Sequence, residues 1–77
     1  MAITPQIDHA LLAASDKRWL KVAMVVSRAA EALGTALPEG PERYEMVAER
    51  LYVLVNGGRL IAEGEVTNWR HSEVRLP

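Results

Sequence analysis

The 77-residue sequence contains no cysteine and no phenylalanine, and its aromatic residues are only two tryptophans and two tyrosines. Without cysteine the chain can form neither a disulfide framework nor a thiolate metal site, so we expect a reducing, cytoplasmic environment. No apolar run approaches the roughly 20 residues that span a bilayer, and the N-terminus lacks a basic region followed by an apolar run, so we expect neither a membrane segment nor a secretory leader. The length predicts a single domain over residues 1–77, and a hydrophobic content of 49% with so few aromatic residues predicts an aliphatic, alanine-rich core.

The sequence also lacks an excess of positive charge, because nine lysines and arginines stand against ten aspartates and glutamates. The most acidic stretch is residues 35–58, which carries four glutamates and two arginines. No stretch has the concentration of lysine and arginine that drives binding to phosphate backbones. The charge distribution therefore disfavours a nucleic-acid partner.

A helix over residues 41–56 is the clearest element of the sequence. Pro41 suits the first helical position, where its missing N–H would have no partner, and Gly57 or Gly58 can end the helix with a positive φ. Apolar residues at three- and four-residue spacing predict one buried stripe. Its members are Tyr44, Val47, Ala48, Leu51, Leu54 and Val55. The outer face carries Glu42, Glu45 and Glu49.

Residues 59–76 change to a two-residue period, which is typical of strands. Apolar and charged residues alternate over residues 59–66 and again over residues 73–76, and residues 67–70 fit a connecting turn. This pattern predicts an antiparallel β-hairpin with one apolar face. The helices must cover that face, because two strands alone are only marginally stable in water.

Two further helices are predicted before residue 34, after a loose end over residues 1–3. The first begins near Thr4 and Pro5, and its buried side comprises Ile7, Ala10, Leu11 and Ala14. The second runs over residues 17–33 and ends at Gly34. Its predicted core arc is Trp19, Val22, Ala23, Val26, Ala29, Ala30 and Leu33, with Leu20, Met24 and Val25 outside it. The spacing leaves no room for a strand between these two helices, and residues 36–37 are the expected short substitute.

Three helices followed by a C-terminal antiparallel β-hairpin predict an α+β, winged-helix-like domain. The C-terminal part of the sequence also resembles a family of small bacterial winged-helix-like domains of unknown function. The resemblance is carried by Arg59-Leu60, by Gly64-Glu65-Val66 and by Trp69-Arg70-His71-Ser72-Glu73-Val74-Arg75-Leu76, and more weakly by residues 19–23. It implies the same fold and brings no activity, since the family has no established one.

No constellation of residues indicates catalysis or a cofactor. His9 and His71 are the only histidines and lie far apart in the sequence, whereas a metal site needs three or four ligands on rigid elements. The serines have no evident base beside them, and Glu63 and Glu65 resemble a glycosidase pair only in residue type. We therefore expect a protein that is not an enzyme and that holds no metal or cofactor.

The apolar residues outside the predicted core favour a protein-interaction or self-associating module, with a protein partner or a second copy in a homodimer. The candidate interface residues are Leu20, Met24, Met46, Tyr52, Val53 and Ile61. The alternative is a nucleic-acid-binding transcriptional regulator, because DNA-binding proteins of this kind place such a helix in the major groove. Its candidate contacts are Arg43, Trp69, Arg70 and Arg75. Glutamates on the outer face of the helix would repel the phosphates, so the protein partner is preferred.

Overall fold

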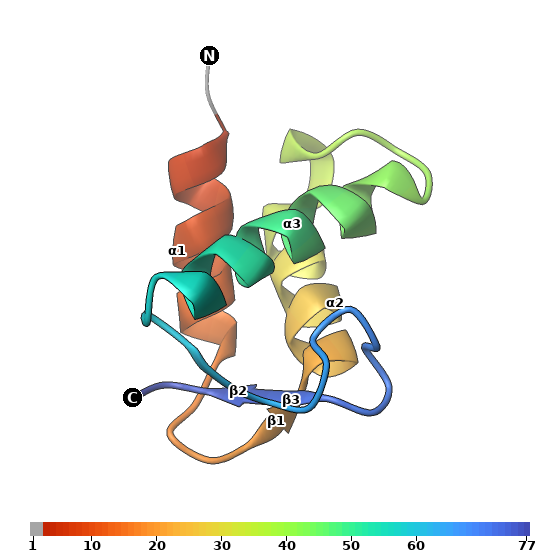
Figure 1. Cartoon of the computed structure of the whole chain (residues 1–77). Helices are drawn as coiled ribbons and strands as arrows, with labels where there is room; N and C mark the ends of the chain where they lie inside the picture. Colours follow the sequence, from red (N-terminus) through yellow and green to blue (C-terminus); the bar gives the residue numbers. More distant parts are fainter. Residues whose placement is uncertain (1–2) are drawn as a thin grey trace.

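The computed structural model describes residues 3–77, so residues 1 and 2 of the loose end expected over residues 1–3 lie outside it. Ile3 is a correction, because it precedes the first turn of α1 and packs against the core. The elements follow the order α1 (Thr4–Ala14), β1 (Leu20–Lys21), α2 (Val22–Leu33), the 3-10 turn η1 (Gly34–Ala36), α3 (Glu42–Asn56), β2 (Ile61–Glu63) and β3 (Glu73–Arg75). Three α-helices pack on one side of a three-stranded antiparallel sheet (Figure 1). This arrangement confirms the predicted α+β class with three helices.

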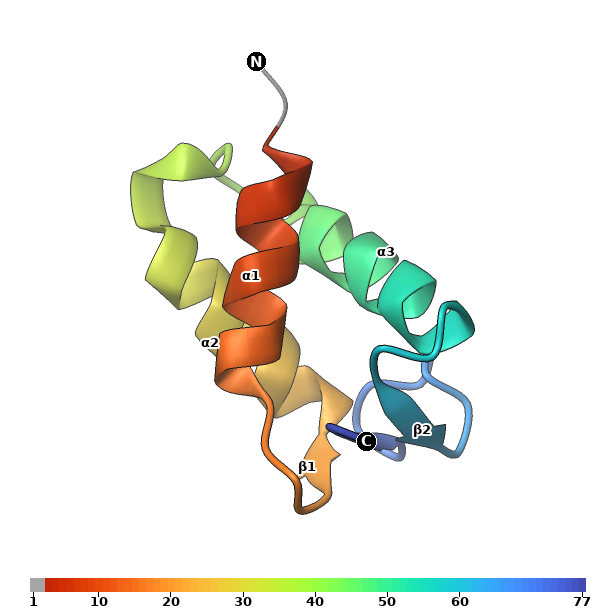
Figure 2. The same cartoon turned by 90° about the vertical axis from the view of Figure 1, so that its left-hand side faces the viewer.

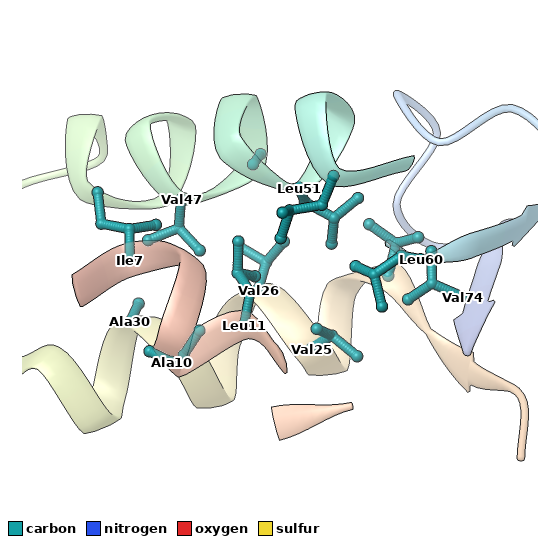
Figure 3. Close-up of a cluster of buried hydrophobic side chains, with 14 of the residues drawn as sticks. Ile7, Ala10, Leu11, Val25, Val26, Ala30, Val47, Leu51, Leu60 and Val74 are labelled. Atoms are coloured by element: carbon teal, nitrogen blue, oxygen red, sulfur yellow. The ribbon is translucent and has the colours of Figure 1, made fainter. Parts of the chain in front are cut away.

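The hydrophobic core lies where the helices and the sheet meet (Figure 3). Helix α3 lies across α1 and α2, as the two views in Figures 1 and 2 show. Fully buried aliphatic side chains come from all three helices and from the sheet, including Leu11, Val25, Val26, Val47, Leu51, Leu60 and Val74. Burying one such side chain contributes roughly 1.5–3 kcal/mol, so short branched residues can build the core without phenylalanine.

Helices α1 and α3 agree with their predicted positions to within one residue. Helix α3 begins at Glu42 after Pro41, and Gly58 has the positive φ, +80°, that was expected just beyond the end of the helix. The predicted stripes are buried at Ile7, Ala10 and Leu11 of α1 and at Val47, Ala48, Leu51 and Leu54 of α3. Tyr44 is a correction, because its side chain is 41% exposed. The buried stripe of α3 therefore covers its later turns and leaves the first turn at the surface.

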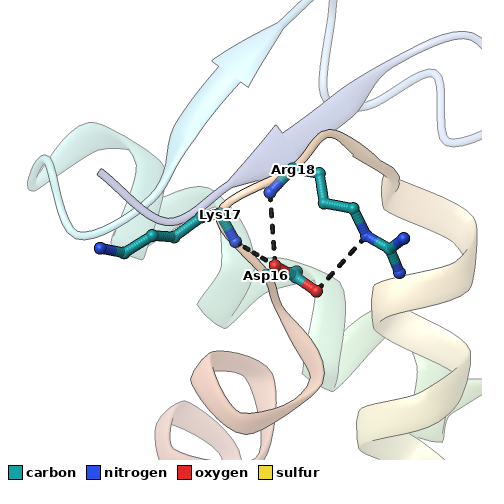
Figure 4. Close-up of polar contacts among 3 residues, drawn as sticks. All are labelled: Asp16, Lys17 and Arg18. Carbon is teal, nitrogen blue, oxygen red and sulfur yellow. Dashed lines mark hydrogen bonds and ion pairs between the residues drawn. The ribbon is translucent and has the colours of Figure 1, made fainter.

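Helix α2 begins at Val22 rather than at the predicted residue 17. The carboxylate of Asp16 accepts hydrogen bonds from the backbone N–H groups of Lys17 at 2.6 Å and Arg18 at 3.4 Å (Figure 4). Such side-chain bonds to the backbone favour a turn over a helix, which explains the later start. Val25 is fully buried, so its predicted position outside the core is wrong.

The sheet has three strands instead of the predicted two, and their order is β1-β3-β2. Strand β1 lies between the first two helices, where the sequence spacing suggested no room. Leu20 pairs with Val74, and Val74 pairs with Ala62 on its other side, so these residues form one row across the sheet. That row packs against the core, which corrects the predicted exposure of Leu20. The substitute strand suggested at residues 36–37 is also wrong, because residues 34–36 form the 3-10 turn.

Residues 64–72 connect β2 to β3, and the connection depends on a glycine at its first position. Gly64 has a φ of +82°, and a Cβ there would lie 3.0 Å from the carbonyl oxygen of His71. Ser72 is buried and donates its hydroxyl to the carbonyl oxygen of Asn68 at 2.7 Å. The chain therefore turns immediately after β2, which ends earlier than the strand predicted to reach Val66.

Candidate interaction surface on helix α3

The outer side of α3 is acidic and contains one strongly exposed valine. Glu42, Glu45 and Glu49 are exposed, as the sequence predicted, and Val53 follows them with 49% of its surface accessible. Their spacing of three and four residues places them on one face of the helix. Within residues 3–77 the two ion pairs involve other carboxylates, so no cation in this part of the chain neutralises these glutamates.

Arg50 belongs to α3 but does not offset the charge of this face. Its Nε and one terminal nitrogen donate hydrogen bonds to the two carboxylate oxygens of Asp8, each at 2.9 Å. The side chains of Arg50 and Asp8 are 29% and 19% exposed, so the pair is partly shielded from water. Hydrogen bonding to Asp8 raises the pKa of Arg50 above its usual value, and the guanidinium stays charged. The pair joins α3 to α1.

Arg43, the other arginine of α3, is also bound within the chain. One of its terminal nitrogens donates to the carbonyl oxygens of Gly34 at 2.9 Å and Ala30 at 3.3 Å. These carbonyls lie at the C-terminal end of α2, where a cation is favourable, and Arg43 adds a charged donor to the backbone N–H groups of Gly34 and Leu37 that they already accept. Arg43 was a candidate nucleic-acid contact, and the structure places it as a cap on α2.

The two arginines of α3 are therefore directed inward while its glutamates are directed outward. We define the α3 surface as the outer-face residues Glu42, Glu45, Met46, Glu49 and Val53, of which Met46 is partly buried. The surface combines three carboxylates with apolar side chains and has no free arginine of its own.

Trp69 and Tyr52 form the border of the α3 surface on the side of the connection between β2 and β3. The indole Nε1–H of Trp69 donates to the hydroxyl oxygen of Tyr52 at 2.8 Å, and both side chains are partly buried against the core. The backbone carbonyl of Trp69 also accepts a hydrogen bond from the N–H of Ala23 at 3.1 Å. Trp69 thus links the connection to α2 and α3, and its indole N–H already has a partner.

The six predicted interface residues are distributed over several elements. Met46, Tyr52 and Val53 share α3, and Met24 lies on α2 with 39% exposure. Leu20 and Ile61 lie in the sheet on opposite faces, because Leu20 is in the row that faces the core and Ile61 is one residue out of that row. Only the three α3 residues belong to one helix face or its border.

The four predicted nucleic-acid contacts do not form one basic surface. Arg70 is exposed in the connection between β2 and β3. Arg75 is in β3, where its guanidinium carbon lies 5.1 Å from the ring centroid of Trp19. Trp19 was predicted in the core and is 36% exposed instead. Neither the Trp19–Arg75 contact nor the Asp8–Arg50 pair has a signal in the sequence, because each joins residues far apart in the chain.

An open groove of about 620 Å³ lies between α1 and α2. It is lined mainly by short side chains, including Ala10, Ala13, Ala14 and Ala32, and His9 and Arg28 also border it. Its lining residues include one histidine, which can act as a general acid or base, but neither a nucleophile nor a carboxylate that could orient it. The described residues contain no group of three or more histidine, aspartate or glutamate side chains placed to hold a metal ion.

None of the helices in residues 3–77 combines the length and the apolar character needed to cross a membrane. No family model, curated protein or solved structure matches the chain. The functional interpretation therefore depends on the chemistry of its surfaces.

Proposed function

We propose that this chain is a winged-helix-like, non-catalytic protein-interaction domain of the bacterial cytoplasm. The fold assignment is supported by the order of elements, in which a strand separates the first two helices and two more strands follow the third. All three strands join one antiparallel sheet with β3 at its centre. The same order supports placing the chain with the small bacterial domains that its C-terminal segment resembles.

The absence of catalysis is proposed from the environment of the buried or half-buried serines. Ser72, the buried polar residue within residues 3–77, donates its hydroxyl to the backbone of Asn68. Ser15 donates its hydroxyl to the carbonyl oxygen of Leu11 at 2.8 Å. A serine nucleophile instead needs a neighbouring base that accepts its proton. Both hydroxyls are thus committed to backbone carbonyls.

The charge on the α3 surface is the observation that carries the proposed function. Duplex DNA is bound through lysines and arginines at its phosphates, and each such contact adds to affinity through counterion release. Here the outer face presents three glutamates, while Arg43 and Arg50 are bound to groups inside the chain. Carboxylates beside the exposed Val53 and the partly buried Met46 instead favour a cationic protein segment that carries apolar side chains of its own.

The alternative, binding of nucleic acid, has weaker support from the structure. The connection between β2 and β3 offers the exposed residues Arg70 and His71, but Glu65 is exposed there as well. One or two phosphate contacts give little affinity near physiological salt, where charges are screened over about 8 Å. We therefore expect no sequence-specific duplex binding by wild-type protein at roughly 150 mM salt.

A designed peptide tests the proposed partner chemistry. We would titrate ¹⁵N-labelled protein with an amphipathic helical peptide of lysine and leucine and map the shifted amide signals. The expected result is a set of shifts along α3 that disappears in the variant E42K/E45K/E49K. The control variant E31K/E39K/E65K changes charge equally at three exposed glutamates elsewhere and should retain the shifts on α3. Shifts that avoid α3, or that survive reversal of the α3 glutamates, contradict the proposal.

The variant E42K/E45K/E49K also distinguishes a protein partner from a nucleic-acid partner. Reversal of the three α3 glutamates should create measurable, salt-dependent binding to random duplex DNA, because it replaces repulsion by attraction at the phosphates. Wild-type protein that binds one particular duplex with submicromolar affinity at roughly 150 mM salt would favour the transcriptional regulator instead.

A further inference from the structure

The outer face of the sheet, on the side away from the helices, carries two rows of side chains with different charge. The row that faces the helices is Leu20, Val74 and Ala62. Because side chains alternate along a strand, the residues on either side of this row point outward. One outward row is Lys21, Glu73 and Glu63, which are paired in register across β1, β3 and β2.

The second outward row has an arginine at its centre. Arg75 of β3 pairs with Ile61 of β2, and Trp19 precedes β1 on the other side of Arg75. The guanidinium carbon of Arg75 lies 5.1 Å from the ring centroid of Trp19, which holds the cation beside an aromatic ring. Trp19 is 36% exposed, and the described helices all pack on the opposite face of the sheet (Figure 2). The row is thus aromatic, cationic and aliphatic in turn.

These two rows are complementary to each other. Consider a two-fold axis that lies just outside the outer face, parallel to the sheet and to the rows, and midway between the rows. It places each row opposite the other row of a second copy, with β3 facing β3. Arg75 then faces Glu73, Lys21 faces the Trp19 ring, and Ile61 faces the methylene groups of Glu63. A two-fold axis along the strands would instead oppose Arg75 to Arg75 and Glu73 to Glu73, so the charges select one orientation.

We infer that the outer sheet face, defined as Trp19, Lys21, Ile61, Glu63, Glu73 and Arg75, binds the same face of a second copy of this chain. The contact is isologous, so each favourable pair occurs twice. It lies on a different face from the α3 surface and goes beyond the proposed function, which does not require a dimer. Both surfaces can be occupied independently.

The size of this face sets the expected strength of the dimer. Three short strands at about 4.8 Å spacing form a contact smaller than the roughly 800 Å² per partner that stable complexes bury. The dimer is therefore weak, and it forms only at high protein concentration.

Charge reversal at the two central positions tests the dimer without requiring any other partner. In the variant E73R both central residues are positive, and in R75E both are negative, so each variant repels itself. An equimolar mixture restores both Arg–Glu pairs, because the doubly positive centre faces the doubly negative one. We expect wild-type protein to show a rise in mass with concentration, each variant alone to remain monomeric, and the mixture to associate at least as strongly as wild type.

Three controls make the result specific to the sheet. The variant E39R changes charge by the same amount at an exposed position outside the sheet and should dimerise like wild type. Glu49→Lys, on the α3 surface, should also leave the mass unchanged, so failure of the α3 proposal does not affect this measurement. Amide spectra of E73R and R75E verify that each variant is folded, and association in the mixture verifies this independently.

Sedimentation equilibrium up to about 1 mM protein measures all these masses, a range set by the weak association expected of a small interface. A wild-type monomer throughout that range overturns the inference, as does a mixture of folded variants that stays monomeric. Loss of the dimer on Glu49→Lys would place the contact on α3 and would equally overturn it.

Discussion

On α3 both arginines donate hydrogen bonds to groups on other elements of the chain, whereas on the sheet Arg75 donates to the carbonyl oxygen of its neighbour Leu76 at 3.0 Å and lies beside Trp19 on the outer face. All charged side chains of the α3 surface are consequently negative, so this surface needs a positively charged partner. The outer sheet face contains both signs in a pattern that complements itself. One small domain thus carries two surfaces that fit different kinds of partner.

This contrast shows that the charge of a segment and the charge of its surface are separate quantities. Residues 35–58 include two arginines, and a count along the sequence would let them offset half of the four glutamates. In the structure Arg43 and Arg50 are unavailable to an approaching molecule, so the surface is more acidic than the segment. The hydrogen bonds that a charged side chain makes within the chain determine whether a binding molecule can contact its charge.

The largest expected effect is a difference in the free energy of unfolding between substitutions on the buried and the exposed side of α3. Leu51 is fully buried, and Leu51→Ala should lower the free energy of unfolding by about 2–5 kcal/mol, because it leaves a cavity in the core. Glu49→Ala, two residues earlier on the exposed side, should change it by no more than about 0.5 kcal/mol. Urea denaturation with a constant m-value measures both. Similar losses for the two variants would mean that the helix is rotated from the orientation described.

A smaller effect is expected at the turn that leads from β2 towards β3. Gly64→Ala should lower the free energy of unfolding by about 1–3 kcal/mol, because alanine is strained at a φ of +82° and its Cβ would meet the His71 carbonyl oxygen. Gly58 is the matched control, since its φ is +80° and a Cβ there has no neighbour within 4 Å. Gly58→Ala should cost about 1 kcal/mol from backbone strain alone. If both substitutions cost the same by thermal denaturation, the close approach at His71 is not restrictive.

The smallest expected effect is a difference in the free energy of unfolding between substitutions of an arginine bound within the chain and an exposed arginine. Arg43→Met should lower the free energy of unfolding by about 1–2 kcal/mol, because the carbonyls of Ala30 and Gly34 lose a charged donor. Arg70→Met, at an exposed position, should change it by about 0.5 kcal/mol or less. Equal stability of both variants in urea would indicate that Arg43 is not needed as the cap of α2.

The sequence predicted those elements whose signal is local. The spacing of Val47, Ala48, Leu51 and Leu54 placed the buried side of α3, and the same spacing placed its glutamates outside. Gly57 and Gly58 marked the end of the helix, and the change of period after them marked strands. These features need only neighbouring residues, so periodicity is sufficient to find them.

The features that the sequence did not predict depend on distant partners. Leu20 and Lys21 fall inside the helix predicted over residues 17–33, but β3 pairs with them and makes them a strand. The N–H of Val22 donates to the carbonyl oxygen of Ser72 at 3.0 Å, a partner that helical periodicity cannot reveal. Arg50 and Asp8 are 42 positions apart, so the inward orientation of Arg50 had no local signal either. The sequence predicted the acidic face of α3, but it did not predict that both arginines of this helix are bound within the chain.

The central position of β3 makes assembly of the sheet dependent on a late segment of the chain. Strands β1 and β2 each pair with β3 and not with each other, so neither has a partner until residues 73–75 arrive. Helices need only local contacts, but closing a long loop costs entropy before its contacts can form. We therefore expect the helices to form first and the sheet to close last during refolding. Because Trp19 lies against Arg75 of β3, its fluorescence in a variant that lacks Trp69 would follow the closing of the sheet.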